Sequence, residues 1–322
     1  MLRTRLCELL GIEVPIIQAG MGPWSPAELA AAASNAGALG SLGGAMIPSD
    51  HLRVQIGRLR SLTDRPFAIN FTSTGILEGA LKVALEARPP VISLALGDAG
   101  DMVERAHAVG SLFVQQVHTV SQARRAAENN VDVIIAQGTE AGGFGQWVST
   151  MALVPQVVDA VSPIPVVAAG GIGDGRGLAA ALVLGAQGVN MGTRFLASQE
   201  ATIPDEWKQA IVSAQSEDAV KVEVWQDIFP EAVTVGFGTV PRALRTPFIE
   251  EWQQKREDAK HEAESLQARV GAAVQQERMH EAVPFTGQSA GLVGEVLPVR
   301  EIVRTLLSEA EKAVDSVVGL KT

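Results

Sequence analysis

The stretch VVAAGGIGDGRGLAAALVLGAQGVNMGTRF, residues 166–195, decides the fold. It contains a short apolar run, a glycine-rich turn, an alanine-rich amphipathic stretch and a second apolar run that ends in glycine. This order predicts a strand, a helix and a second strand. Near-continuous apolar strands, rather than alternating ones, are typical of a parallel sheet that helices cover on its faces.

The same alternation runs through the first two thirds of the chain. Eight apolar runs occur before residue 196, at 14–20, 38–44, 66–71, 91–97, 112–117, 131–138, 165–171 and 188–195. Eight βα units are the number that closes a (β/α)8 TIM barrel, which is therefore the predicted α/β fold. A doubly wound open sheet is the alternative, and it usually has fewer strands before its topology reverses.

The pattern changes after this region, which predicts an inserted segment. We expect residues 1–197 and 286–322 to form the barrel and residues 198–285 to form a helical insertion or lid. Residues 250–283 are highly charged, with one weak apolar stripe. We expect a single solvated helix lying on the barrel, or alternatively a lid or a contact with a second copy in a homodimer. The stripe consists of Trp252, Ala259, Ala263, Leu266, Val270 and Ala273.

Composition and charge exclude several classes of protein. Apolar residues make up 47% of the chain and charged residues 19%, which is enough to build a large core. The net charge of −10, without a basic stripe, argues against nucleic acid as a partner. The single Cys7 excludes a disulfide framework, and no targeting segment or membrane-length apolar run is visible. These features predict a cytoplasmic protein with a small-molecule substrate and no membrane partner.

The catalytic face of such a barrel lies at the carboxyl ends of its strands. Glycine and neutral amides dominate the positions expected there, and no cluster of His, Asp and Glu is present. This composition argues against a metal site and against a glycosidase that needs two carboxylates. A flat ligand with polar edges, approached closely by backbone, fits better.

Two glycine patches end the last two predicted strands, at residues 168–177 and 191–195. Loops at these positions are the usual phosphate site of the fold. Backbone N–H groups there, with a helix amino terminus behind them, can bind a phosphate without lysine. The simpler alternative is that the glycines only permit tight turns. Gly175, Gly177 and Ala180 also fit a dinucleotide G-x-G-x-x-A motif, but no acidic residue follows the next strand, so that interpretation is weak.

The combination of AQGTEAGG, AAGGI and MGTRF, with VPIIQAGMG early and GQSAGL late, resembles the nitronate monooxygenase (2-nitropropane dioxygenase) family. These are FMN-dependent TIM-barrel enzymes, and the chain is also similar to the related FMN-dependent enoyl-ACP reductases. The resemblance implies an FMN cofactor and a flavoprotein oxidoreductase. It implies cofactor-binding roles for Ala19, Gly20, Met21, Asn70, Gln116, Gln137, Gly142, Gly143, Gly170, Gly171, Gly192, Thr193, Gln288 and Ser289.

One residue departs from the family pattern. The family motif reads AGGH and its histidine is the proposed base, whereas Phe144 stands at that position here. A positioned base typically contributes about 10²–10⁴-fold, and a phenyl ring cannot supply it. His118, at the end of the fifth predicted strand, is the candidate substitute base, although a loop or supporting role is the simpler interpretation.

Three functions remain compatible with the sequence. The first is oxidation of alkyl nitronates by O2, because a nitronate is already an anion and needs no base. The second is an NAD(P)H-dependent FMN reductase of an enone, enoyl thioester or quinone, in which NAD(P)H is the co-substrate and Phe144 forms an apolar wall. The third is a flavin-binding protein with little turnover.

Overall fold

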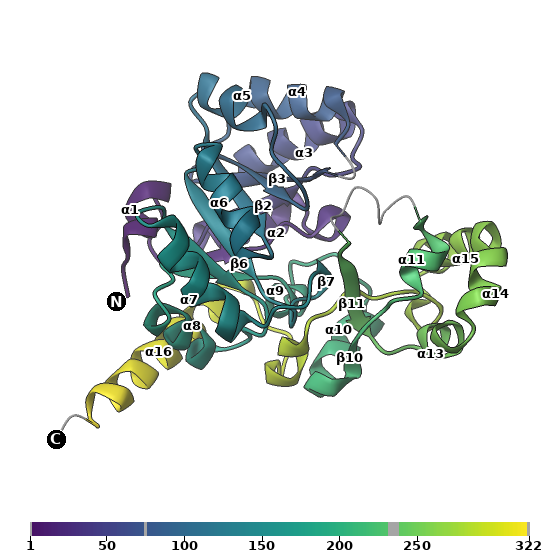
Figure 1. Cartoon of the computed structure of the whole chain (residues 1–322). Helices are drawn as coiled ribbons and strands as arrows, with labels where there is room; N and C mark the ends of the chain where they lie inside the picture. The colour runs from purple at the N-terminus through teal and green to yellow at the C-terminus, as the bar shows by residue number, and fades with distance from the viewer. Residues whose placement is uncertain (1, 74–75, 231–237, 321–322) are drawn as a thin grey trace.

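Eight parallel strands form a barrel in the computed structural model, which describes residues 2–73, 76–230 and 238–320 (Figure 1). The hydrogen-bonded order is β1-β9-β8-β6-β5-β4-β3-β2, and a bridge between Ile17 and Leu39 joins the two ends of the sheet. The predicted barrel is thereby confirmed, and the open sheet is excluded. The strands are β1 Ile16–Gln18, β2 Gly40–Gly43, β3 Phe67–Thr72, β4 Val91–Ala95, β5 Leu112–Val117, β6 Val133–Gln137, β8 Val166–Ala169 and β9 Gly188–Met191.

Helices surround this barrel. The last helix, α16, packs against α8 and α2 and so closes the outer ring. A short helix, α9 Thr193–Leu196, follows β9 directly. The surrounding helices are α2 Ala27–Asn35, α3 Ser49–Leu62, α4 Glu78–Ala87, α5 Met102–Ala108, α6 Val120–Glu128, α7 Thr150–Val161, α8 Gly175–Val183 and α16 Val299–Val318.

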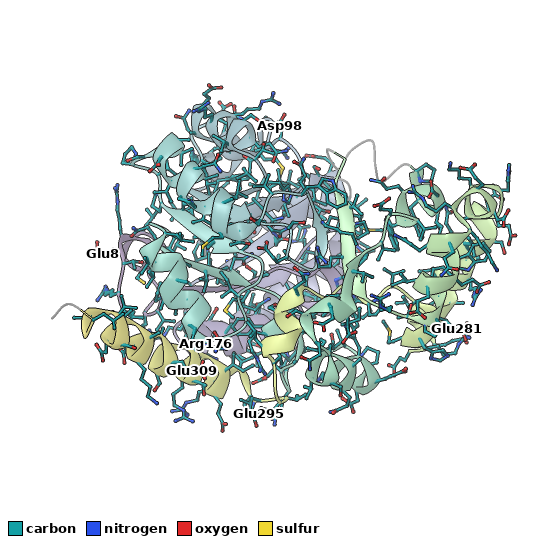
Figure 2. All side chains as sticks on the ribbon, turned by 60° about the horizontal axis from the view of Figure 1, so that its bottom comes forward. Glu8, Asp98, Arg176, Glu281, Glu295 and Glu309 are labelled. Atoms are coloured by element: carbon teal, nitrogen blue, oxygen red, sulfur yellow. The ribbon has the colours of Figure 1, made fainter. Side chains whose placement is uncertain are left out.

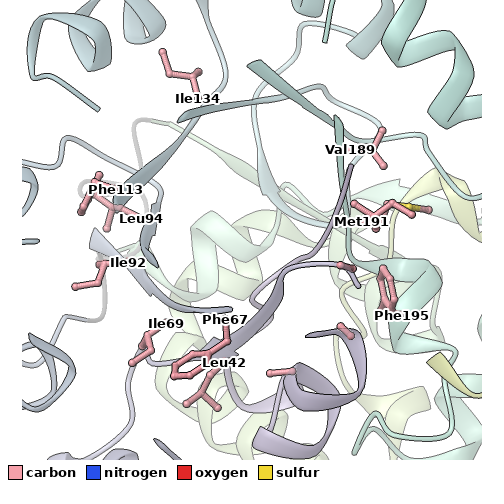
Figure 3. Packing of buried hydrophobic residues seen from close by; sticks show 14 of the residues in the cluster. Leu42, Phe67, Ile69, Ile92, Leu94, Phe113, Ile134, Val189, Met191 and Phe195 are labelled. Carbon is pink, nitrogen blue, oxygen red and sulfur yellow. The ribbon is translucent and has the colours of Figure 1, made fainter. Parts of the chain in front are cut away.

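Charged residues such as Glu8, Asp98 and Arg176 lie at the periphery (Figure 2), and the barrel has two apolar layers inside. The larger layer fills the space between strands and helices, where outward-facing residues such as Phe67, Ile69 and Phe113 pack (Figure 3). The smaller layer fills the amino-terminal half of the barrel, and α1 (Arg5–Leu10) contributes Leu6 and Leu10 to it. Because the amino-terminal end is plugged, a ligand can enter the barrel only at the carboxyl end.

The inserted segment contains strands as well as helices. Strands β10 (Ala219–Lys221) and β11 (Val240–Leu244) pair antiparallel, and β11 also pairs with β7 (Gly143–Gly145) from the sixth loop of the barrel. The expectation of a purely helical insertion was therefore incomplete. Strands of three and five residues are too short to show an alternating hydrophobic pattern in the sequence. Its helices are α10 Asp205–Ser213, α11 Trp225–Ile228, α13 Pro247–Gln254, α14 Arg256–His261 and α15 Ala263–Gln275.

The charged stretch forms three helices rather than one. They lie beyond the three-stranded sheet, on its far side from the barrel, so the expectation of a single helix lying on the barrel was wrong (Figure 1). Trp252, Ala259, Leu266 and Val270 of the predicted stripe are buried in a separate core with residues of α11 and β11. The stripe thus stabilises the insertion itself. No helix in the described part of the chain combines the length and the hydropathy that a membrane crossing requires.

Candidate active site

A cavity of about 320 Å³ opens at the carboxyl end of the barrel. None of the described residues that line it carries an ionisable side chain. Apolar groups, glycines and neutral amides or hydroxyls make up its wall. Most residues to which the family resemblance assigned a role lie here, namely Ala19, Gly20, Met21, Gln116, Gln137, Gly142, Gly143, Phe144, Gly170, Gly171, Gly192, Thr193 and Ser289.

Three of the predicted site residues lie outside this lining. Asn70 borders a smaller cavity deeper in the barrel. Gln288 contributes its backbone N–H, which donates to the carbonyl oxygen of Glu140 at 2.9 Å. His118 is buried, and it lines neither cavity.

The turn after β8 depends on glycine for its conformation. Gly170 and Gly171 have φ values of +98° and +73°, which side chains rarely adopt. A Cβ at Gly170 would lie 2.9 Å from the carbonyl oxygen of Gly138, so the turn also requires close approach of two backbones. The N–H groups of Gly170 and Gly171 have no acceptor among the described residues. They are therefore free to donate to an anionic ligand in the cavity.

The amino terminus of α8 does not supply such donors. The Asp174 carboxylate accepts from the N–H of Gly177 at 3.1 Å, and Glu309 on α16 accepts from the N–H of Gly175 at 2.9 Å. The sequence suggested that this helix start stands behind a phosphate. Instead, two carboxylates satisfy it and place negative charge there, so the available donors are the glycine turns.

The late GQSAGL motif closes one side of the cavity. The N–H of Gly287 donates to the Thr193 hydroxyl oxygen at 2.9 Å. A Cβ on Gly142 would lie 2.6 Å from the nitrogen of Gly287, so the sixth loop and the late segment touch through bare backbone. Residues separated by more than 90 positions in the chain, such as Thr193 and Gly287, are thus joined at one wall.

Phe144 lies on β7 and faces the cavity together with Phe285. The two rings meet edge-on, with centroids 5.4 Å apart, and Trp225 meets both from behind at 6.1 Å and 5.4 Å. Phe229 in turn stacks on Trp225 at 4.1 Å. Edge-to-face pairs of this kind hold each ring in one orientation. The wall of the cavity at Phe144 is therefore a fixed aromatic surface.

Two cations stand behind this wall. Lys221 Nζ donates to the carbonyl oxygens of Gly145 and Val240 at 2.9 and 3.0 Å, and Arg242 Nε donates to that of Thr139 at 2.9 Å. Burial, with the nearby Arg242 charge, lowers the pKa of Lys221 to about 8. Neither cation has a carboxylate within 4.0 Å among the described residues. The sixth loop is thus held from outside by two cations, with the Glu140 carboxylate near both but not in direct contact.

His118 is poorly suited to act as a base. Its side chain is 3% exposed, and neither ring nitrogen has a hydrogen-bond partner among the described residues. Burial lowers the pKa of His118 to about 4, so the ring is neutral at pH 7.

A polar floor lies beneath the cavity, and three of its residues, Ser41, Ser93 and Asn190, were not among the predicted site residues. Side chains that alternate along each strand face the barrel axis, and five of these inward positions in the carboxyl-terminal half of the barrel are polar: Ser41, Asn70, Ser93, Gln116 and Asn190 border the deeper space. An otherwise apolar strand with one polar residue near its carboxyl end was the available signal. No group of three or more potential metal ligands occurs among residues 2–73, 76–230 and 238–320.

Comparison with known proteins gives a consistent family. The model of the nitronate monooxygenase family matches residues 3–79 and 72–309. The chain is 38% identical over 271 residues to a probable nitronate monooxygenase of Staphylococcus saprophyticus, a match that covers 69% of this chain and 76% of that protein.

A second group of relatives has a different name. Over 253 residues the chain is 38% identical to the (3aS,4S,5R,7aS)-5-hydroxy-7a-methyl-1-oxo-octahydro-1H-indene-4-carboxyl-CoA dehydrogenase of Mycobacterium tuberculosis, covering 77% of this chain and 68% of that protein. The match to the Rhodococcus jostii protein of the same name, at 39% identity, covers 67% of this chain and only 62% of that protein's length.

Solved structures agree along nearly the whole chain. FabK from Thermotoga maritima has a TM-score of 0.91 and 36% identity, covering 99% of this chain and 100% of that one. Nitroalkane oxidase from Streptomyces ansochromogenes has a TM-score of 0.83 and 26% identity, covering 97% and 99%.

Proposed function

The chain belongs to the nitronate monooxygenase family and is therefore an oxidoreductase, and we propose that it uses FMN to oxidise alkyl nitronates with O2 without a proton-abstracting side chain. The observation that carries this proposal is the wall of the cavity. Phe144 lines it where the family motif has a histidine, and no described lining residue is ionisable. A substrate that must lose a carbon-bound proton has no partner here, whereas a nitronate has already lost that proton.

The residues present fit FMN. The free N–H groups of Gly170 and Gly171, with Gly192 and the Thr193 hydroxyl beside them, provide neutral donors for a phosphate. Ala19, Gly20 and Met21, after β1, offer a flat backbone surface for a ring. The neutral amides of Gln116 and Gln137 can meet polar ring or ribityl atoms. A bound FMN would supply the two-electron chemistry of the reaction.

The chain's own groups would then bind and orient the substrate. Phe144 and Phe285 would hold it against the ring and exclude water from that side. Lys221 and Arg242 lie just behind the wall, and their positive charge would favour an anionic substrate over its neutral conjugate acid. No proton transfer to the protein is needed in this scheme.

A reductase is the second candidate, and the aromatic wall favours it. An apolar surface formed by Phe144 and Phe285 suits a flat unsaturated acyl group or a quinone, and the indene-carboxyl-CoA dehydrogenases act, by their name, on an acyl-CoA. NAD(P)H would be the reductant. Hydride transfer depends on orientation more than on a base, so the absence of an ionisable group in the cavity is compatible with this reaction.

Anaerobic stopped-flow absorbance separates the candidates. The FMN-loaded protein is mixed with ethylnitronate, and in separate experiments with NADH and NADPH, while the visible flavin absorbance is followed. Bleaching by the nitronate alone supports nitronate oxidation. Bleaching by a pyridine nucleotide alone contradicts it and supports the reductase. Stable flavin absorbance in all mixtures would leave a flavin-binding protein with little turnover.

A further inference from the structure

A second, smaller cavity lies at the centre of the barrel, below the proposed FMN site. Its volume is about 30 Å³. Ala19, Gly20, Ala95, Gln116 and Asn190 border both cavities, so the two spaces adjoin. Apolar residues of the inner barrel layer form the lower wall of the small cavity, and α1 plugs the barrel beneath that layer.

The polar side chains around this cavity make few hydrogen bonds to other described residues. Five polar side chains border it, those of Ser41, Asn70, Ser93, Gln116 and Asn190. Their only mutual hydrogen bond joins Asn70 Nδ2 to Ser93 Oγ at 2.8 Å. No other side-chain hydrogen bond from these five to a described residue is found. Ser41 and Asn190 are buried, and a buried polar group usually has a hydrogen-bond partner, which water can supply.

We propose that the small cavity binds ordered water, about two molecules, as a permanent part of the fold. One water requires roughly 10–15 Å³ of such volume and two to four polar partners, and this cavity satisfies both conditions. Ser41 and Ser93 supply hydroxyl groups, and Asn70 supplies its free carbonyl oxygen. A cavity of the same size with only apolar walls would stay empty.

The waters also form a floor for the larger cavity. Of the two cavities, Asn70 borders only the small one. It lies so close to the loop after β1 that a Cβ added to Gly20 would be 2.3 Å from the Cβ of Asn70. Asn70, Ser41 and Ser93 border the small cavity and not the larger one. This inference concerns the ligand-free protein and does not depend on the proposed function.

Two substitutions at Ala68 test the proposal, because a wet and a dry cavity predict opposite changes of Tm for Ala68→Val relative to Ala68→Ser. Ala68 borders the small cavity, is 1% exposed and belongs to the inner layer. Ala68→Val fills the space with an apolar group, whereas Ala68→Ser adds a hydroxyl that can bond to water. If water occupies the site, Ala68→Val lowers the Tm of the FMN-free protein by roughly 2–4 °C and Ala68→Ser leaves it nearly unchanged. If the cavity is dry, Ala68→Val raises the Tm above that of Ala68→Ser.

Valine could also lower the Tm by overpacking the barrel, with or without water in the cavity. A crystal structure of the unsubstituted protein distinguishes these causes. We expect electron density for water within hydrogen-bonding distance of Ser41, Asn70 and Ser93. A cavity without density, or side chains repacked to close it, would overturn the proposal.

Discussion

The side-chain amide of Gln137 donates to the backbone carbonyl of Phe144 at 2.8 Å. Gln137 ends strand β6, and Phe144 lies in the centre of β7, so this bond ties the sixth loop back onto the barrel. Lys221 holds the next carbonyl, that of Gly145, at 2.9 Å. Together with the pairing to β11, these contacts fix the position of Phe144 at the wall of the cavity.

Phe144→His should restore activity toward neutral nitroalkanes. An imidazole at this position would face the cavity and could accept a carbon-bound proton, which we expect to accelerate flavin reduction by nitroethane about 10²-fold or more. Phe144→Leu is the matched control, since it keeps an apolar side chain without a base. Anaerobic stopped-flow measures both rates. Equal rates for the two variants would contradict the role assigned to this position.

Gly192→Asp should abolish retention of FMN, whereas Gly192→Ala should not. Gly192 has a φ of −103°, and a Cβ there would lie 3.5 Å from Met21 Sδ, an ordinary contact. Alanine is therefore tolerated, while a carboxylate beside the phosphate should weaken FMN binding at least about 100-fold. Flavin titration of both purified variants measures the effect. If Gly192→Asp still retains FMN, the phosphate must bind elsewhere.

Lys221 should make nitronate binding depend on pH. Because its pKa is lowered to about 8, the ammonium is charged below that pH and neutral above it. We expect the KM for ethylnitronate to rise about three- to tenfold as pH increases through 8. Lys221→Arg should remove the rise, and Lys221→Met should show the high KM at every pH. Identical profiles for all three proteins would show that this charge does not act on the substrate.

His118 should reduce stability in acid. Its pKa falls from 6.5 to about 4 on folding, so between these values the unfolded chain binds a proton that the folded chain does not. The free energy of unfolding should therefore fall as pH decreases from 6.5 to about 4, by about 3 kcal/mol in total. Urea unfolding across this range should show a flatter acid limb for His118→Gln than for the control His51→Gln. Parallel curves would mean that His118 becomes protonated in the native state.

Most of the barrel could be predicted from the sequence because its strands are buried on both faces. The run at 165–171 is continuous and apolar, and strand β8 lies there as expected. The sheet of β7, β10 and β11 was not predictable, since its strands are short and its register depends on Phe144 meeting Pro241 across about 100 positions.

Part of the site was also predictable from the sequence, and part of it was not. Gly170 and Gly171 could be found because a glycine turn after a strand has a definite physical use. The capping of α8 by Glu309, which comes from the last helix, could not be found from local sequence. Ser93 was overlooked because a single serine in a buried strand has no meaning until the strands close into a ring.

A crystal structure of the protein with FMN tests the central claim most directly. We predict that the isoalloxazine ring lies on residues 19–21 and that the phosphate accepts from the N–H groups of Gly171 and Gly192. The ring of Phe144 should face the substrate side, with no ionisable side chain between them. FMN bound elsewhere, or a histidine, lysine or carboxylate in contact with the reactive edge of the flavin, would contradict the account.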